Sequence, residues 1–237
     1  FKEVLKMKFR LTLILSLIVV IASCKSTPAE IPLGTWNYDL IVNGVKAGKA
    51  SVTSEKNNNT YITTSEMSLK VGPIENKSIQ VVKESADFKP VSLDVTNTIY
   101  DSSTNKKQEI KKSATFNGQK VTLTTGEYKS EFTIDKPFVL EGNFFFSELI
   151  KNKFKEGTVV KAYIYEPTVE IEEPILVIVE VQGYKDIDIN GKTKKLLLLK
   201  QKVEKLKSLD VYINEEGVTE KVVIKMLNNI FELVKAD

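Results

Sequence analysis

The chain has 237 residues, with 34 Lys and Arg side chains, 31 Asp and Glu side chains and no histidine. Its single cysteine is Cys24 and its single arginine is Arg10, which excludes Ser-His and Cys-His nucleophiles, disulfide frameworks and the usual zinc sites. The net charge of +3 comes from residues 1–23, so the remainder is balanced and nothing in it suggests the basic stripe of a nucleic-acid-binding protein. We expect no nucleic-acid partner, no cofactor and no enzymatic activity.

The N-terminal segment has the pattern of a secretory signal. The apolar run Leu11–Ile21 follows Lys8 and Arg10 and is followed by small residues. It is too short for a membrane span, which needs about 20 residues. We therefore expect residues 1–23 to be a signal peptide, with Met7 as the true start. The alternative is an uncleaved N-terminal anchor helix.

The end of this run resembles a bacterial lipobox. Ile21, Ala22 and Ser23 directly precede Cys24. The resemblance implies cleavage before Cys24, a diacylglyceryl group on its sulfur and a lipoprotein anchored in the bacterial cell envelope. Two or three acyl chains anchor a protein durably, whereas one chain anchors it only marginally. Lys25 follows the cysteine, which in the enterobacterial sorting pattern favours the outer membrane.

Residues 24–34 contain prolines and small polar residues, and we expect them to form the lipidated cysteine and a short tether. From residue 35 the pattern changes to alternation with period two, beginning with Trp36, Tyr38 and Leu40 on one face. The small residues around Gly48 predict a β-bulge or a close backbone approach. We expect residues 35–237 to form one β-domain of about twelve strands.

Turn signals divide this β-domain into hairpins. The pairs Asn43-Gly44, Asn117-Gly118 and Asn190-Gly191 are typical of two-residue hairpin turns, and a longer turn is expected over residues 214–217. Residues 192–206 have helix-favouring composition, but the preceding Asn-Gly turn and the alternation favour a strand. Hairpins in series predict a large curved antiparallel sheet, which forms an open or a closed β-barrel.

The alternation is interrupted at residues 141–154, where the apolar spacing predicts one short helix. Phe144, Phe145 and Leu149 are candidates for lining an apolar ligand pocket. The alternative is that these side chains fill the core beneath the helix. Four glutamates cluster at residues 166–173, but their spacing fits no calcium loop, and we expect a solvated acidic loop without a metal.

Two stretches carry a resemblance to a known family. The opening strands, with Gly44, Gly48 and Ala50, and the closing hairpin around Tyr212 resemble the periplasmic β-domains grouped as DUF3108 and those that precede transglutaminase-like modules. The closing hairpin has Tyr212 where that family commonly has tryptophan. The resemblance implies a curved sheet like that of the carriers LolA and LolB, which hold acyl chains in an apolar concavity.

These patterns predict a membrane-anchored binding module for a lipid, another apolar ligand or an envelope protein partner. A second hypothesis is a structural lipoprotein with a packed interior and no small ligand. A third is a carboxylate-based hydrolase, although no pair of carboxylates stands out in the sequence.

Overall fold

The computed structural model describes residues 27–168, 171–204, 208–226 and 229–236. The signal motif Ile21, Ala22 and Ser23, and Cys24 after it, lie outside the described residues. Within the described part, no helix is long and apolar enough to span a membrane.

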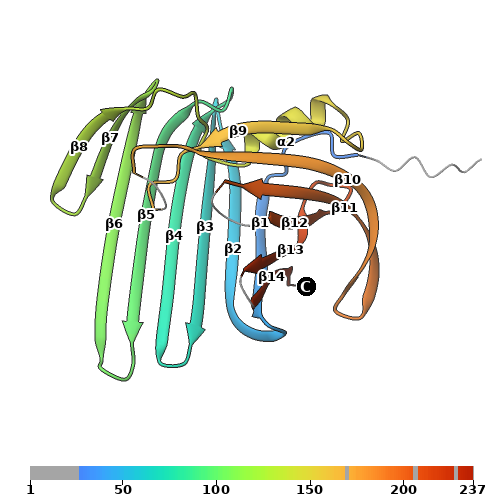
Figure 1. Cartoon of the computed structure of the whole chain (residues 1–237), viewed down its shortest axis with the longest axis horizontal. Coiled ribbons are helices and arrows are strands. Elements are labelled where there is room, and N and C mark those ends of the chain that lie inside the picture. The colour runs from blue at the N-terminus through green and yellow to red at the C-terminus, as the bar shows by residue number, and fades with distance from the viewer. Residues whose placement is uncertain (1–26, 169–170, 205–207, 227–228, 237) are drawn as a thin grey trace, which may run out of the picture.

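Fourteen strands form one antiparallel sheet that curves around its own inner face (Figure 1). The order is β8-β7-β6-β5-β4-β3-β2-β1-β14-β13-β12-β11-β10-β9, so every neighbouring pair is consecutive in sequence except β1 and β14. The sheet is open between β8 and β9, and α2, the one helix among the described residues, lies in the connection between these two strands. The expected all-β fold with a large curved antiparallel sheet is confirmed.

The strands are β1 Gly34–Val42, β2 Val45–Asn57, β3 Thr60–Val71, β4 Ile74–Ser85, β5 Pro90–Asp101, β6 Lys106–Asn117, β7 Lys120–Thr125, β8 Tyr128–Thr133, β9 Val159–Ile164, β10 Ile175–Ile189, β11 Lys192–Val203, β12 Ser208–Ile213, β13 Thr219–Met226 and β14 Asn229–Lys235. Helix α2 spans Asn143–Lys151. Residues 192–203 are a strand, as the alternation predicted.

The hairpin turns lie at the predicted glycines, but one turn begins one residue later than expected. Asn43 and Gly44 both have positive φ, as a type I′ turn requires. Asn117, however, pairs with Lys120, so the turn there consists of residues 118 and 119 and not of Asn117 and Gly118. Gly118 has a φ of 60° at the first turn position, which is typical of a type II′ turn.

The predicted irregularity in β2 is present. The register between β1 and β2 shifts between Leu40 and Ile41, because Leu40 pairs with Gly48 and Ile41 with Lys46. A Cβ atom on Gly48 would lie 2.0 Å from the carbonyl oxygen of Ser68 on β3. Only glycine permits this close approach of backbones.

The core fills the part of the interior nearest to α2. Val82, Leu93 and Ala114 pair across β4, β5 and β6 and define the inner face of the sheet. Ile134, Phe138, Leu140 and Tyr165 pack on this face. A second cluster packs Phe145 and Leu149 of α2 against the inner residues of β9–β12. Hydrophobic burial by these two clusters is the main stabilising term of the fold.

The connection that carries α2 partly closes the open side of the sheet. Val139 forms a parallel bridge with Ile164 of β9. Its N–H donates to the carbonyl of Tyr163, and its carbonyl accepts from the N–H of Tyr165. The edge of β9 is therefore paired, whereas β8 pairs only with β7 in the described sheet.

Residues 27–33, expected as part of a tether, pack along the same end of the domain as α2. Pro28 is buried. A Cβ atom built on Gly217 would lie 3.2 Å from the Cβ of Pro28 and 2.3 Å from the ring of Phe146, which shows how closely these three residues pack. The chain thus enters the sheet beside α2.

Candidate functional site

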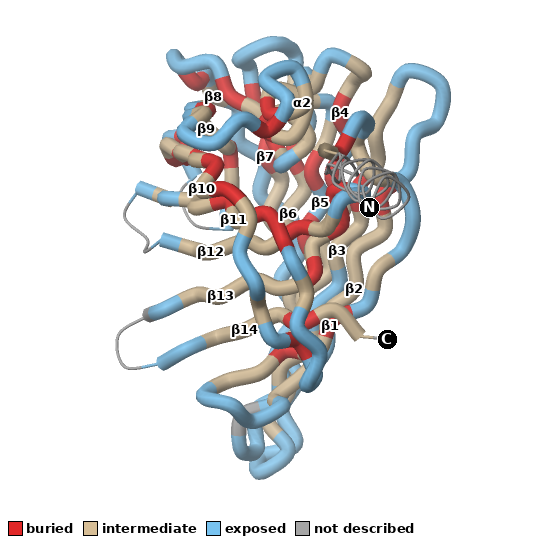
Figure 2. The backbone as a smooth tube through the Cα atoms, turned by 90° about the vertical axis from the view of Figure 1, so that its right-hand side faces the viewer, coloured by how far each residue is buried: buried red, intermediate tan, exposed pale blue. Residues whose placement is uncertain are grey.

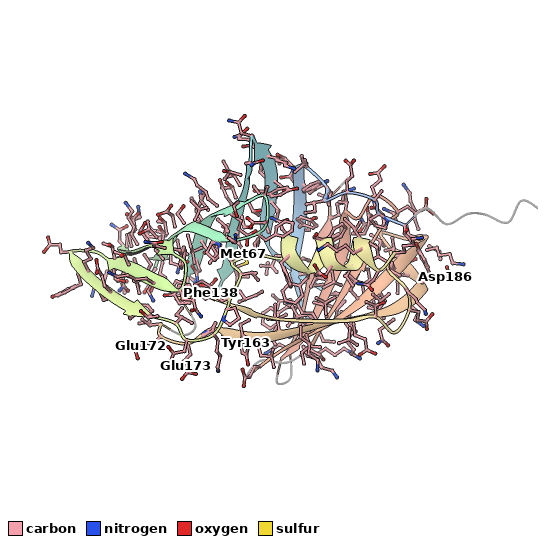
Figure 3. All side chains as sticks on the ribbon, turned by 90° about the horizontal axis from the view of Figure 1, so that it is seen from above. Met67, Phe138, Tyr163, Glu172, Glu173 and Asp186 are labelled. Atoms are coloured by element: carbon pink, nitrogen blue, oxygen red, sulfur yellow. The ribbon has the colours of Figure 1, made fainter. Side chains whose placement is uncertain are left out.

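The inner face of the sheet is uncovered in the half of β3–β6 that lies away from α2. Register pairs place Met67, Ile99 and Ile110 on the same face as the buried Val82, Leu93 and Ala114. We call this surface the distal inner face; its residues are Met67, Leu69, Ile74, Ile99 and Ile110. Figure 2 shows the distal ends of these strands exposed, and Figure 3 shows Met67 projecting to the inside of the curve.

The distal inner face carries large apolar side chains that stay partly exposed in the described structure. Met67, Ile74, Ile99 and Ile110 are 37–40% exposed. Ser78, Asn76 and Asn97 lie between them on the same face. An exposed group of large apolar side chains on one face commonly marks a binding surface.

The outer face of the same strands is charged. Lys77 lies 4.0 Å from Glu66, and Glu109 pairs with Lys111 at 2.9 Å and with Lys107 at 3.9 Å. This division of apolar and charged side chains resembles that of a sheet with one covered face, yet in the distal half both faces reach solvent. On β6, between the exposed Ile110 and the buried Ala114, the Lys112 ammonium donates to the Pro167 carbonyl at 2.7 Å. This contact lies at the boundary between the packed interior and the distal inner face.

A separate pocket of about 250 Å³ lies where α2 begins. We call it the helix-end pocket. Its walls are the inner face of β1–β3, the start of α2, the β12–β13 turn and the segment before β1. The lining residues are Ile31, Pro32, Trp36, Tyr38, Val52, Ser54, Thr63, Glu141, Gly142, Asn143, Phe146, Gly217, Val218 and Thr219.

Ser54 is an unsatisfied polar residue in this lining. It is only 7% exposed, and its hydroxyl oxygen has no hydrogen-bond partner in the described structure. Thr63, which pairs with Ser54 across β2 and β3, is buried beside it. Leaving a buried hydroxyl unpaired costs about 1–3 kcal/mol, so Ser54 indicates that the pocket is built for a polar group.

Two carboxyl groups meet at the start of α2. Glu84 is 1% exposed, and its Oε1 accepts from the N–H groups of Leu140 (3.1 Å) and Glu141 (3.2 Å). Its Oε2 accepts from the amide of Asn143 at 3.3 Å. Burial raises the pKa of Glu84, against the effect of these three hydrogen bonds.

Glu141 is partly exposed and lines the helix-end pocket. Burial, followed by the charge of Glu84, raises the pKa of Glu141 to about 7. Glu84 is enclosed by backbone donors and cannot reach a substrate, so these two carboxyl groups do not form the opposed pair of a glycosidase.

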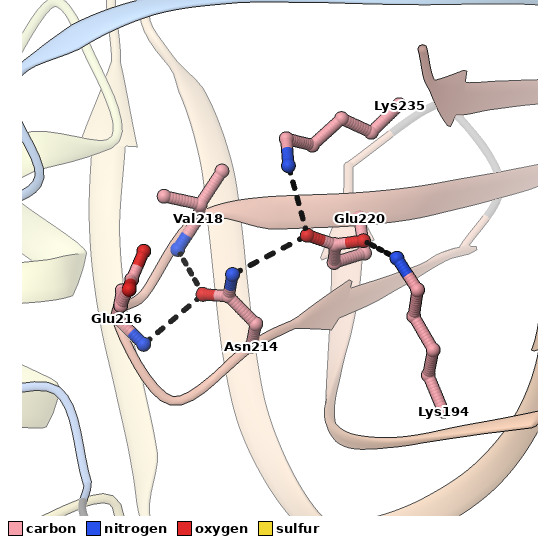
Figure 4. Close-up of polar contacts among 6 residues, drawn as sticks. All are labelled: Lys194, Asn214, Glu216, Val218, Glu220 and Lys235. Atoms are coloured by element: carbon pink, nitrogen blue, oxygen red, sulfur yellow. Dashed lines mark hydrogen bonds and ion pairs between the residues drawn. The ribbon is translucent and has the colours of Figure 1, made fainter. Parts of the chain in front are cut away.

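A buried ion cluster holds the β12–β13 turn, which forms one wall of the pocket (Figure 4). Glu220 is 4% exposed and lies 2.6 Å from the ammonium of Lys194 and 3.2 Å from that of Lys235. Burial favours a higher pKa for Glu220, but the hydrogen bonds from the two lysines outweigh it and lower the pKa. Glu220 is therefore ionised at neutral pH.

Asn214 connects this cluster to the turn. Its side-chain amide donates to Glu220 at 3.3 Å, and its side-chain oxygen accepts from the N–H groups of Glu216 and Val218 (Figure 4). The cluster thus fixes the loop that places Val218 and Thr219 against the pocket. Glu220 also acts on Tyr38, whose pKa is raised to about 12 by burial and then by this charge.

The three residues that the sequence suggested as a ligand lining lie in two different environments in the structure. Phe145 and Leu149 belong to the packed cluster between α2 and the sheet and line none of the described pockets, which fits the alternative that they fill the core. Phe144 is half-buried and lines a surface groove beside Phe88 and Ile31. Phe146, of the same run of three phenylalanines, borders the helix-end pocket.

The acidic segment is a solvent-facing loop in its described part. Glu172 and Glu173 are exposed and point away from the domain (Figure 3), while Glu170 lies outside the described residues. No group of three acidic or cysteine side chains capable of holding a metal occurs among the described residues.

Sequence reasoning missed Ser54, Glu84 and Glu141. One signal was present: Glu84 follows the inner-facing Val82 by two residues, so the alternation places a charge on the buried face. No comparable signal marks Glu141, because its neighbourhood depends on the chain returning across the inner face.

Comparison with known proteins supports the fold. The chain is similar to a β-barrel-like protein of the domain of unknown function DUF1849 from Brucella abortus, with a TM-score of 0.62 and 11% sequence identity over 86% of this chain and 95% of that one. A DUF1089 family protein from Pseudomonas aeruginosa aligns with a TM-score of 0.37, 8% identity and coverage of 81% and 90%. Neither a family model nor a curated protein sequence matches the chain. The β-barrel-like fold is thus shown, while the finer resemblance to DUF3108 and LolA stays a prediction.

Proposed function

We propose that this chain is a non-enzymatic lipoprotein of the bacterial cell envelope, anchored through Cys24, and that its distal inner face binds an apolar ligand such as a lipid acyl chain. The observation that carries the proposal is the group of partly exposed apolar side chains on the inner face, opposite a charged outer face. The barrel-like fold of the DUF1849 protein agrees with a ligand-binding or a structural module.

The geometry favours a narrow ligand over a broad protein surface. The apolar residues lie on the inner side of the curve and are separated by small polar residues such as Ser78 and Asn97. Each methylene that an acyl chain buries contributes about 0.8 kcal/mol. About ten buried methylene groups correspond to the ~8 kcal/mol of a micromolar complex. Such a complex therefore forms even when only part of the acyl chain is covered.

The packed part of the interior, nearest to α2, restricts where such a ligand can lie. Phe145 and Leu149 occupy the volume beneath α2, so a continuous apolar cavity under the helix is not available. The second hypothesis, a structural lipoprotein with no ligand, therefore fits the half of the domain nearest to α2. The uncovered distal half is what distinguishes the ligand-binding proposal from it.

Photo-crosslinking in cells tests this function. A diazirine-bearing fatty acid is supplied, the full chain is purified after illumination, and the labelled peptides are mapped by mass spectrometry. We expect labelled peptides from β3–β6, separate from any label on the N-terminal peptide. The double variant Ile99→Asn, Ile110→Asn should lose at least about nine-tenths of the β3–β6 label.

The matched control is Ile230→Asn, because Ile230 is similarly exposed at 44% but lies on β14, outside the distal inner face. This variant should retain the label. Label confined to the N-terminal peptide, or equal β3–β6 label in the double variant, would contradict ligand binding on the distal inner face and favour the structural hypothesis.

A further inference from the structure

The helix-end pocket is distinct from the distal inner face, and its chemistry is different. The pocket is lined by hydroxyl groups, one carboxyl, one side-chain amide and three aromatic rings. Its volume of about 250 Å³ lies below the roughly 300–1,000 Å³ of pockets for drug-sized ligands. The ligand that it suits is therefore a small molecule.

The start of a helix ordinarily attracts anions, but here an anion is already supplied by the chain. Glu84 accepts from the N–H groups of Leu140 and Glu141, just before the helix, and from the Asn143 side-chain amide, which holds its carboxylate at this end of α2. Among the described residues that line the pocket, none is a lysine. A second anion would find repulsion from Glu84 and Glu141 and no cation to offset it.

The remaining polar groups are suited to accept hydrogen bonds. The Ser54 hydroxyl is buried without a partner and lines the pocket, so a ligand N–H would satisfy its oxygen. The Glu141 carboxylate also accepts. A bound donor would remove the cost of the unpaired Ser54 hydroxyl, so this residue points to a ligand independently of the helix end.

The apolar part of the lining suits a cation with an attached hydrocarbon. Trp36 and Phe146 present aromatic surfaces, and an ammonium group within about 6 Å of an aromatic ring centre is attracted to its face. Val52 and Val218 add aliphatic surface. A carboxylate beside aromatic rings, without a neighbouring cation, is a recurrent arrangement for holding an organic ammonium group.

We infer that the helix-end pocket binds a small primary ammonium compound with a short apolar chain. The ammonium group donates to the Glu141 carboxylate and the Ser54 hydroxyl, and the chain packs against Trp36 and Phe146. This site is independent of the distal inner face, and either one can exist without the other.

Binding at this site depends on the ionisation of Glu141. The charged groups that face Glu141 are the carboxylates of Glu84 on β4 and Glu166 after β9, and both raise its pKa, after burial, toward 7. An ammonium ligand requires the ionised carboxylate. Affinity therefore rises as the pH rises through about 7, until the ligand amine itself loses its proton.

Trp36 supplies the assay, because it is the single tryptophan of the chain and lines the pocket. The full chain, purified in a non-ionic detergent, is titrated with n-butylammonium, with 1-butanol as the neutral analogue and butyrate as the anionic one, while Trp36 emission is recorded. We expect saturable binding of n-butylammonium, at least about tenfold tighter than 1-butanol, and no response to butyrate. The affinity for n-butylammonium should increase between about pH 6 and about pH 8.

Two variants locate the contact. Glu141→Gln should weaken n-butylammonium binding at least about tenfold and abolish its pH dependence, and Ser54→Ala should weaken it about threefold. Glu148→Gln is the control, because Glu148 lies on the same helix but pairs with Lys151 at 2.6 Å on the outside. Circular dichroism verifies that each variant is folded.

Three results would each overturn the inference: no response of Trp36 to n-butylammonium, equal affinity for 1-butanol, or unchanged affinity in Glu141→Gln. None of these results bears on acyl-chain crosslinking at β3–β6. The two proposals are therefore tested separately.

Discussion

The raised pKa of Glu141 predicts that replacing this residue changes how stability depends on pH. Glu141 lies beside the buried Glu84 at the start of α2, and no lysine lines the pocket that it borders. Glu141→Gln keeps a side chain of the same length and removes the ionisation. We expect the variant to be more stable than the parent at pH 8.

The magnitude follows from the difference between the folded pKa of about 7 and the ordinary value of 4.5. The folded state retains a proton that the unfolded chain releases above pH 4.5, so stability falls as the pH rises from 4.5 through about 7. At 1.36 kcal/mol per pKa unit the ceiling is roughly 3 kcal/mol. Because Glu141 is partly exposed and water screens its charge, about 1–3 kcal/mol is expected.

Urea unfolding monitored by circular dichroism at about pH 5 and about pH 8 measures this difference. The advantage of Glu141→Gln should be largest at the higher pH and should fall to about a quarter of that value at the lower one. Glu148→Gln serves as the control, since Glu148 is paired with Lys151 on the surface. A variant with the same pH slope as the parent, or one less stable at pH 8, would refute the reasoning.

Three further predictions concern the backbone, the ion cluster and the anchor. Gly48→Ala should lower the free energy of unfolding by at least about 2 kcal/mol because its Cβ would meet the Ser68 carbonyl at 2.0 Å, whereas Gly142→Ala, at a φ of −66° in open space, should be neutral or slightly stabilising in thermal melts. Glu220→Gln should cost about 1–2 kcal/mol, since it removes the charge that pairs with two partly exposed lysines, and hydrogen exchange should show faster opening of residues 214–218. Cys24→Ala should abolish incorporation of a palmitate analogue, and equal labelling of parent and variant would remove the lipoprotein assignment.

Much of the strand architecture could be predicted from local pattern. Alternation placed Trp36, Tyr38 and Leu40 on one face, and they do pair with Val52, Ala50 and Gly48 on the inner side of β2. Asn-Gly pairs marked the hairpins because their preferred φ values suit the twist of the flanking strands. The shift at Asn117 shows the limit of this reasoning, since Gly118 fits either position of such a turn.

The candidate sites depend on contacts that local pattern does not encode. Glu84 and Asn143 meet because the segment after β8 returns across the inner face. Glu220 lies at an irregularity of register between β12 and β13, where Ile213 pairs with Thr219 and Tyr212 with Lys221. The alternation of side chains does not reveal such a bulge, so the partners of Glu220 could not be predicted.

The pairing of β1 with β14 has a consequence for how the chain folds. Strands β1–β8 and β9–β14 are two meanders whose internal pairings are all between sequence neighbours, and one long-range ladder joins them, with Leu40 opposite Leu233. Each meander closes only short loops, whereas the joining ladder closes almost the whole chain. We therefore expect the two halves to form rapidly and their union, through β1 and β14, to be the slow step. Variants that weaken the β1–β14 ladder should slow folding, whereas variants in the outer hairpins should mainly accelerate unfolding.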